Sequence, residues 1–249
     1  MNDRVAIVTG SSSGLGAAAA RELARRGWRL VINYSKNLDA ANTVAADCPG
    51  AIVVQADVGD DAQCRKLAQV SLDAFGRIDA LVNNVGATKQ VPHDNLDGLD
   101  ADDFLFIYRM NVVSSYQMTR ACAPALKAAR GAIVNVSSGA ARVGTGSSIA
   151  YAASKAALNT MTMSLARVLA PEVRVNAVCP GYTETPWHIS AHGPEKAALL
   201  AERYAARAPL KQAGDPQDLA QTIAWLIEGA RQVTGATIYS DSGMHIATP

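Results

Sequence analysis

The stretch Val5-Ala-Ile-Val-Thr-Gly-Ser-Ser-Ser-Gly-Leu-Gly16 decides the fold of this 249-residue chain. A short apolar run ends at a glycine, and an alanine-rich segment of helical character follows over residues 17–27. Glycines permit a tight turn and a close approach of the backbone to a diphosphate, and the N-terminus of the next helix offers unpaired N–H groups. The hydroxyls of Ser11, Ser12 and Ser13 add hydrogen-bond donors. The stretch therefore predicts a strand, a phosphate-binding loop and a helix, in that order.

Strand-like and helix-like segments alternate along the rest of the chain. Strand-length apolar runs recur at 30–33, 51–56, 78–83, 132–136 and 173–178, and helical segments lie between and after them at 38–46, 61–75, 111–129, 151–169 and 216–227. Strands that are apolar on both faces and separated by helices predict a parallel sheet covered on two sides, in a doubly wound α/β fold. The acidic, turn-rich residues 90–103 and the proline-containing residues 182–212 interrupt the alternation. We expect one domain over residues 1–249, with a substrate lid at 182–212 that includes a short helix near 195–206.

Composition excludes several classes of protein. Apolar residues make up 49% of the chain and the formal net charge is only +1, which argues against binding to nucleic acid or to an anionic membrane. The N-terminus lacks the features of a signal peptide, and no apolar run approaches the length of a membrane span. The four cysteines are widely spaced and the four histidines are scattered, so we expect free thiols, a cytoplasmic protein, solvated histidines and no metal.

Tyr151 and Lys155 are the strongest candidates for chemistry. They lie four positions apart on the helical segment 151–169, so they share one helix face. A nearby ammonium group favours the phenolate form of a tyrosine and lowers its pKa. The pair alone is a weak signal, because a tyrosine and a lysine at this spacing usually mark a solvated helix face. Together with the glycine loop, however, it predicts a general acid or base.

These motifs resemble, in order, those of the short-chain dehydrogenase/reductase family, and the resemblance runs essentially end to end. It implies a Rossmann-type sheet of about seven strands. Within the family, the sequence most resembles 3-oxoacyl-[acyl-carrier-protein] reductases. Two positions depart from the family pattern, with Val85 in place of an alanine and Ser242 in place of a glycine. The matching segments are Thr9–Gly16, Asn83–Gly86, Ser138 with Tyr151 and Lys155, Pro180–Thr185, Val233–Gly235 and Asp241–Gly243.

The resemblance implies a role for each catalytic candidate. Tyr151 protonates the alkoxide left by hydride transfer, and Lys155 lowers the pKa of that tyrosine and binds the nicotinamide ribose. Ser138 donates a hydrogen bond to the carbonyl oxygen, as oxyanion-stabilising groups do. Asn111, expected at the head of its helix, holds a water that links Lys155 to solvent. Two other interpretations stay open, with Ser137 and Ser138 as turn residues and Asn111 as a helix cap.

The cofactor is expected to be NADP(H) in preference to NAD(H). The second strand ends at Asn33 and Tyr34 without a carboxylate that would repel a 2′-phosphate, and Ser35 with Lys36 could hold that phosphate. Ser13 argues the other way, because many NADP-preferring relatives carry an arginine there. No lysine follows Gly16, which argues against a nucleoside-triphosphate loop. The predicted cofactor-binding residues are Gly10, Ser11, Ser12, Ser13, Gly14, Leu15, Gly16, Asn33, Tyr34, Ser35, Lys36, Asp57, Val58, Asn84, Val85, Gly86, Tyr151, Lys155, Pro180, Gly181, Thr183 and Thr185.

The expected reaction is reduction of a ketone, such as a 3-oxoacyl thioester, or oxidation of a secondary alcohol. Residues 147–150 depart from a segment common in acyl-carrier-protein reductases, so an NAD-linked sugar, steroid or alcohol dehydrogenase stays open, as does a non-catalytic dinucleotide-binding protein. The candidate pocket residues are Val143, Ile149, Tyr182, Trp187 and His188. Small residues along 111–129 and 151–169, the helices that pair between subunits in this family, predict a homotetramer or homodimer.

Overall fold

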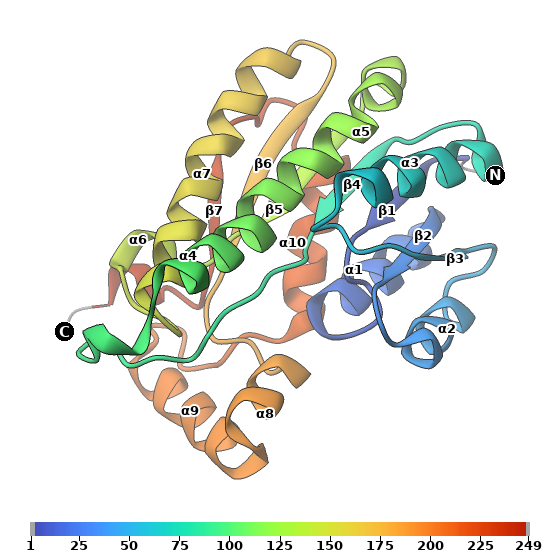
Figure 1. Cartoon of the computed structure of the whole chain (residues 1–249). Coiled ribbons are helices and arrows are strands. Elements are labelled where there is room, and N and C mark those ends of the chain that lie inside the picture. Colours follow the sequence, from blue (N-terminus) through green and yellow to red (C-terminus); the bar gives the residue numbers. More distant parts are fainter. Residues whose placement is uncertain (1–2, 248–249) are drawn as a thin grey trace.

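The computed structural model describes residues 3–247 and contains one seven-stranded parallel sheet (Figure 1). Its strand order is β3-β2-β1-β4-β5-β6-β7, so the chain reverses direction across the sheet between β1 and β4. This order extends that of a Rossmann fold and confirms the predicted doubly wound architecture. The strands are β1 (Val5–Val8), β2 (Arg29–Tyr34), β3 (Ile52–Gln55), β4 (Ala80–Asn83), β5 (Ala132–Val136), β6 (Arg174–Pro180) and β7 (Thr237–Ser240).

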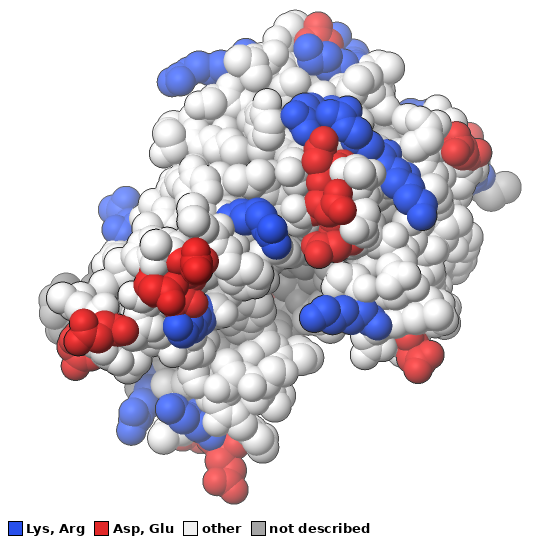
Figure 2. Space-filling view, viewed as in Figure 1, with Lys and Arg blue, Asp and Glu red and all other residues white. Residues whose placement is uncertain are grey.

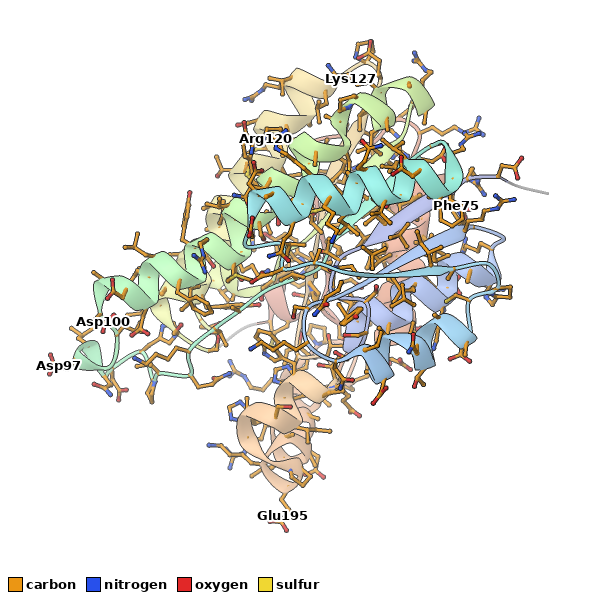
Figure 3. The ribbon with its side chains drawn as sticks, turned by 45° about the vertical axis from the view of Figure 1, so that its right-hand side comes forward. Phe75, Asp97, Asp100, Arg120, Lys127 and Glu195 are labelled. Carbon is orange, nitrogen blue, oxygen red and sulfur yellow. The ribbon has the colours of Figure 1, made fainter. Side chains whose placement is uncertain are left out.

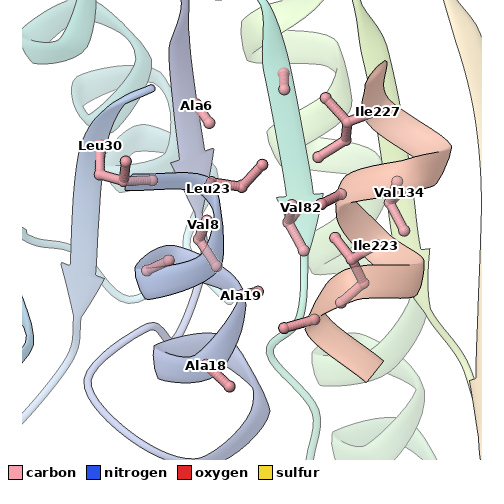
Figure 4. Close-up of a cluster of buried hydrophobic side chains, with 14 of the residues drawn as sticks. Ala6, Val8, Ala18, Ala19, Leu23, Leu30, Val82, Val134, Ile223 and Ile227 are labelled. Carbon is pink, nitrogen blue, oxygen red and sulfur yellow. The ribbon is translucent and has the colours of Figure 1, made fainter. Parts of the chain in front are cut away.

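Helices cover both faces of the sheet because successive strand residues point to opposite sides. In β1, Ala6 and Val8 face one layer, while Val5 and Ile7 face the other. Each fully buried side chain of leucine or isoleucine size contributes about 1.5–3 kcal/mol to stability. Figure 4 shows the first layer, in which Leu23 of α1 and Ile223 of α10 pack on the sheet. That layer consists of α1 (Gly14–Arg25), α2 (Leu38–Ala46) and α10 (Pro216–Glu228), and the other consists of α3 (Asp61–Phe75), α5 (Ser114–Ala129) and α7 (Ile149–Leu169).

One helical path runs further than the sequence predicted. It starts at α4 (Ala101–Tyr108), passes through a π-helical turn (Arg109–Val113) and continues into α5. Asp100 begins α4 with a capping box, in which its side chain accepts from Asp103 N at 2.9 Å and the Asp103 side chain accepts from Asp100 N at 3.1 Å. The predicted helix start at residue 111 was therefore wrong, because the acidic residues before it form a helix cap.

The segment 182–212 contains two helices, of which the sequence predicted the second. They are α8 (Pro186–His192) and α9 (Pro194–Arg207), and α9 was predicted almost in full. They project from the body of the molecule, with Glu195 at the tip (Figure 3). Three short elements complete the fold: the helix α6 (Ala140–Val143) and the 3-10 turns Leu96–Gly98 and Met244–Ile246.

The surface carries charges of both signs close to one another (Figure 2). Arg120 of α5, for example, pairs with Asp61 at the start of α3, and Arg65 pairs with the same aspartate at 3.0 Å. Figure 2 also shows the outline notched between α8–α9 and the part that carries α1 and α2. Within residues 3–247, no helix has both the length and the apolar character needed to cross a membrane.

Candidate active site

The glycine loop after β1 is fastened to the end of β4 by polar contacts. The Thr9 hydroxyl accepts from Asn84 N at 3.0 Å and from Val85 N at 3.3 Å, and Asn84 Nδ2 donates to Thr9 O and Gly10 O at 3.0 and 3.2 Å. A Cβ atom on Gly16 would lie 2.5 Å from both Asn84 Nδ2 and Gly10 O, so only glycine fits there. Asn84 thus holds the loop in shape, and Gly10 and Gly14 supply its left-handed backbone at φ +61° and +53°.

A second set of contacts ties the loop to β2. Asn33 is 1% exposed; its Oδ1 accepts from Gly10 N at 3.0 Å, and its Nδ2 donates to Ala56 O at 3.1 Å. The buried Ser11 hydroxyl accepts from Asn33 N at 2.9 Å. Asn33, predicted as a cofactor contact, uses its side chain for bonds within the protein, and the Ser11 hydroxyl accepts one such bond. Tyr34 is also buried, which leaves Ser35 and Lys36 as the exposed residues at the end of β2.

The open side of the loop fits a dinucleotide diphosphate. Ser12 is partly buried, Ser13 is exposed, and the Ser13 side chain makes no capping hydrogen bond among the described residues. The first N–H groups of α1 are thus free of a side-chain cap, as an anion-binding helix N-terminus requires. Thr185, which precedes α8, approaches to 3.6 Å from the Cβ position of Gly14 and borders the loop from the lid side. These residues would hold the diphosphate of a nicotinamide dinucleotide.

Tyr151 and Lys155 lie in the first two turns of α7. Ser148 caps this helix, its hydroxyl accepting from Tyr151 N at 3.3 Å. Lys155 is 3% exposed, and its Nζ donates to Val136 O at 2.9 Å and lies 5.7 Å from the centre of the Tyr151 ring. Ser138 follows β5, the strand that contributes this carbonyl, so the structure brings the three predicted catalytic side chains together.

Burial dominates the acid–base properties of the site. It raises the pKa of Tyr151 to about 12, although a hydrogen bond with Ser138 acts in the opposite direction. Burial also lowers the pKa of Lys155 to about 8. Burial of the phenol therefore outweighs the predicted lowering of the Tyr151 pKa by Lys155. The reason is that both charged forms lose hydration, while the ammonium group donates to a backbone carbonyl instead of the phenol.

Asn111 lies in the π-helical turn and is fully buried. Its Oδ1 accepts from Ala87 N at 2.7 Å, and its Nδ2 donates to Ala87 O at 3.0 Å and to Ser154 Oγ at 2.8 Å. Asn111 is therefore neither a helix cap nor at the head of a helix. It joins the loop after β4 to α7, one residue before Lys155. Because both amide hydrogens are engaged, a water held by Asn111 would donate to Oδ1 or to its backbone carbonyl, which also accepts from Ser115 Oγ at 3.3 Å.

The remaining predicted cofactor residues border the same edge of the sheet. Asp57 is exposed after β3 and its Oδ1 accepts from Gly59 N at 2.9 Å, while Val58 is buried. The Cβ position of Gly86 lies 3.4 Å from Lys155 Nζ, so this loop reaches Lys155. Partly buried Leu15 packs on the core. Pro180 ends β6, and Gly181, the buried Thr183 and Thr185 lead from it into α8.

Two histidines expected in solvent make specific contacts. His188 stacks on Tyr182 with ring centres 4.0 Å apart, and burial lowers its pKa to about 4. His245 Nδ1 lies 2.8 Å from Asp241 Oδ1, and its ring stacks on Tyr239 at 4.5 Å. The four-residue spacing of Asp241 and His245 is visible in the sequence and could have indicated their pair. No local pattern indicates the contact of His188. Among the described residues, no cluster of His, Cys, Asp and Glu side chains could hold a metal ion.

Comparison with known proteins agrees with this geometry. A family model described as enoyl-(acyl carrier protein) reductase matches residues 10–245. A Burkholderia xenovorans structure described as a short-chain dehydrogenase/reductase superposes with a TM-score of 0.91 at 40% identity, covering 99% of this chain and 100% of that one. The chain belongs to the short-chain dehydrogenase/reductase family. It is an oxidoreductase that acts on carbonyl or alcohol groups with a nicotinamide dinucleotide.

Curated relatives of this short-chain dehydrogenase/reductase differ in substrate. A Streptomyces violaceoruber protein named as a ketoacyl reductase of granaticin polyketide synthase is 39% identical over 243 residues, with 97% of this chain and 96% of the relative covered. An Azotobacter vinelandii protein named L-rhamnose 1-dehydrogenase (NAD(P)(+)) is 37% identical over 257 residues, covering 98% and 97%. Membership of the family thus indicates the type of reaction, but the names of these relatives indicate different substrates.

Proposed function

We propose that this protein is an NADP(H)-dependent reductase of ketones, with a 3-oxoacyl thioester as its substrate class. The observation that carries the proposal is the position of the buried Tyr151 beside Ser138 and Lys155, where its raised pKa keeps the phenol protonated at neutral pH. A protonated phenol can donate a proton to an alkoxide, which is the requirement of the reductive direction. The relative named as a ketoacyl reductase supports the same substrate class.

In the proposed mechanism Ser138 binds the substrate, and Tyr151 and Lys155 carry out proton transfer. A bound dinucleotide would supply the hydride. Ser138 Oγ donates a hydrogen bond to the substrate carbonyl oxygen, where negative charge develops. Tyr151 Oη gives its proton to that oxygen, so the product is an alcohol and the tyrosine becomes a phenolate. The Lys155 ammonium stabilises this phenolate until a solvent proton restores the phenol.

The preference for NADP(H) rests on the end of β2. Ser35 and Lys36 are exposed there, and the first carboxylate after them is Asp39, within α2. A lysine and a hydroxyl can bind a 2′-phosphate, and a carboxylate would repel it. We expect Lys36→Ala to weaken NADPH binding more than NADH binding, measured by quenching of tryptophan fluorescence. Equal losses for the two dinucleotides would rule out Lys36 as the phosphate anchor.

The deciding test of function compares the wild type with Tyr151→Phe. The variant keeps the ring and removes the proton donor. We expect reduction of acetoacetyl-CoA, followed as NADPH consumption, to fall by roughly 10²–10⁴-fold, the range that a positioned general acid contributes. NADPH binding should change little and serves as the control for folding. Retained turnover would exclude Tyr151 as the donor.

A second candidate function is an NAD(P)-linked sugar dehydrogenase, which the relative named L-rhamnose 1-dehydrogenase favours. The same Tyr151 would then act as a base, and burial works against its phenolate at neutral pH. Oxidation of L-rhamnose with NAD or NADP at a rate above that of acetoacetyl-CoA reduction would replace the first proposal. A wild type that binds a dinucleotide but turns over neither substrate class would favour a non-catalytic role.

We further propose that residues 182–212 act as the lid of the substrate pocket and that the protein assembles as a homotetramer. Thr185 at the glycine loop and the stacked Tyr182 and His188 support the position of the lid. Exposed apolar side chains on α4, α5 and α7 support assembly, since large apolar patches mark protein–protein contacts. Four free, buried cysteines fit the reducing cytoplasm.

A further inference from the structure

The hydroxyl of Tyr204 connects the projecting helices α8 and α9 to the turn that follows β7. Tyr204, in the last turn of α9, donates from Oη to Asp241 O at 2.6 Å. Asp241 directly follows β7 and is 4% exposed. The Tyr182 hydroxyl also holds α9, donating to Ala197 O at 2.7 Å, but little buried apolar surface restrains the two helices, because α8 has no buried residue and α9 buries only Ala197 and Ala201. Segments with so little buried apolar surface open at low free-energy cost, so one hydrogen bond has a large effect on them.

The phenol of Tyr204 occupies a space that only a glycine leaves free. A Cβ atom on Gly181 would overlap the Tyr204 hydroxyl, and it would lie 2.6 Å from Tyr204 Cζ and 3.1 Å from Asp241 Cβ. Gly181 has no positive φ, so its backbone conformation does not require glycine. The close packing of Tyr204 and Asp241 explains why a glycine stands at position 181. Three segments far apart in the sequence therefore meet at one point beside the end of β6.

Asp241 lies between Tyr204 and the loop that holds Ser138. Its carboxylate accepts from Gly243 N at 3.1 Å and from His245 N at 2.8 Å, which fixes the turn. Asp241 Oδ2 lies 3.9 Å from the Cβ position of Gly139, the residue after Ser138. At the other end of the turn, Leu210 N donates to Ser242 O at 3.1 Å. The turn thus lies between the end of the α8–α9 segment and the loop that holds Ser138.

We propose that Tyr204 is a positioning residue whose hydroxyl latches α8 and α9 to the Asp241 turn and thereby holds the lid against the dinucleotide site. The proposal rests on the proposed function for what the lid covers, but the latch itself is a property of the fold. Without the hydroxyl, the lid opens more often and fewer molecules have an assembled pocket. Apparent affinity then falls with that fraction, while the chemical step is unchanged.

The first test follows hydrogen exchange of the full chain without ligand. In Tyr204→Phe the ring stays and the hydroxyl is lost, and we expect amides of residues 186–207 to exchange roughly fivefold faster, as the loss of one net hydrogen bond predicts. Amides of β1 and β4 should keep their wild-type rates. Tyr239→Phe is the matched control. The Tyr239 hydroxyl takes part in no hydrogen bond within residues 3–247, and its ring stacks on His245, the partner of Asp241. Unchanged exchange in 186–207, or an equal increase everywhere, would overturn the latch.

A second variant tests the packing. Gly181→Ala should displace Tyr204 and accelerate exchange in 186–207 at least as much as Tyr204→Phe does. Combined with Tyr204→Ala, which empties the space, the same substitution should add nothing further, because the two residues share one contact. Additive effects would show that Gly181 and Tyr204 act independently and would remove the basis of the latch.

Steady-state kinetics test whether the Tyr204 latch affects substrate binding. With acetoacetyl-CoA and NADPH as probes, Tyr204→Phe should raise KM severalfold and change kcat by less than about twofold. Faster exchange in the lid with an unchanged KM would overturn the positioning role. If the wild type binds neither NADPH nor NADH, the proposed function fails, and the exchange experiment still decides whether the latch exists.

Discussion

At the residue scale, the burial of Tyr151 and Lys155 gives the site its pH dependence. The pKa of Lys155 lies near 8, so its ammonium, which stabilises the phenolate, is lost above that pH. We predict that kcat/KM for ketone reduction by NADPH falls as pH rises from about 8 to 10. Tyr151 stays protonated throughout this window because its pKa is about 12. The profile is measured with constant ionic strength, and a flat profile to pH 10 would contradict the assignment.

The titration of Lys155 does not itself lower the stability of the fold in this window. The pKa of Lys155 is below its unfolded value of 10.5, so the unfolded chain binds more protons between pH 8 and 10.5. The contribution of Lys155 to stability therefore rises with pH in that window, opposite to the expected activity. Far-UV circular dichroism at each pH separates the two effects.

Ser242 is a second residue with a measurable consequence. It replaces a glycine of the family motif and adopts φ +54°, a left-handed conformation that side chains with a Cβ disfavour. We predict that Ser242→Gly raises the free energy of unfolding by about 0.5–1 kcal/mol, the relief of strain less the extra entropy of the unfolded chain. Urea unfolding measures the change. Ser242→Ala keeps the Cβ and the strain, so it should give no gain; an equal gain in both variants would exclude strain as the cause.

At the scale of elements, the sequence predicted those helices whose ends carry local signals. The predicted bounds of α2 and α3 are confirmed, because Asn37 and Asp60 cap their first turns and Gly76 ends α3 in a left-handed conformation. The start of α4 was missed because Asp100 and Asp103, which form its capping box, lie in an acidic stretch that resembles a turn.

Functional contacts between elements were harder to predict than the elements themselves. The candidate catalytic side chains Ser138, Tyr151 and Lys155 could be named because their spacing resembles that of the short-chain dehydrogenase/reductase family. The partners of Asn111, which are Ala87 and Ser154, lie 24 and 43 positions away and follow no local period. The same holds for Asn33, whose position suggested a cofactor contact but whose side chain is used within the protein. Such roles depend on which segments the sheet order brings together.

At the scale of the whole molecule, exposed apolar side chains gather on the layer that contains α4, α5 and α7. Leu105 on α4 is 68% exposed and Val168 on α7 is 67% exposed, and α4 packs along α7. Figure 1 shows these helices side by side on the outside of the sheet. Neither residue contributes to the core of the single chain. We propose that they contact another subunit, since large exposed apolar patches mark protein–protein contacts.

We predict that Leu105→Glu or Val168→Glu lowers the mass of the assembly, because a carboxylate at a subunit contact loses hydration without gaining a partner. Sedimentation velocity should give a wild-type mass of about four chains of 26.0 kDa and a dimer or monomer for either variant. Leu38→Glu is the matched control, since Leu38 is 47% exposed on α2, in the opposite layer, and the change should leave the mass unaltered. A wild-type monomer, or variants that keep the full mass, would exclude this face as the subunit contact.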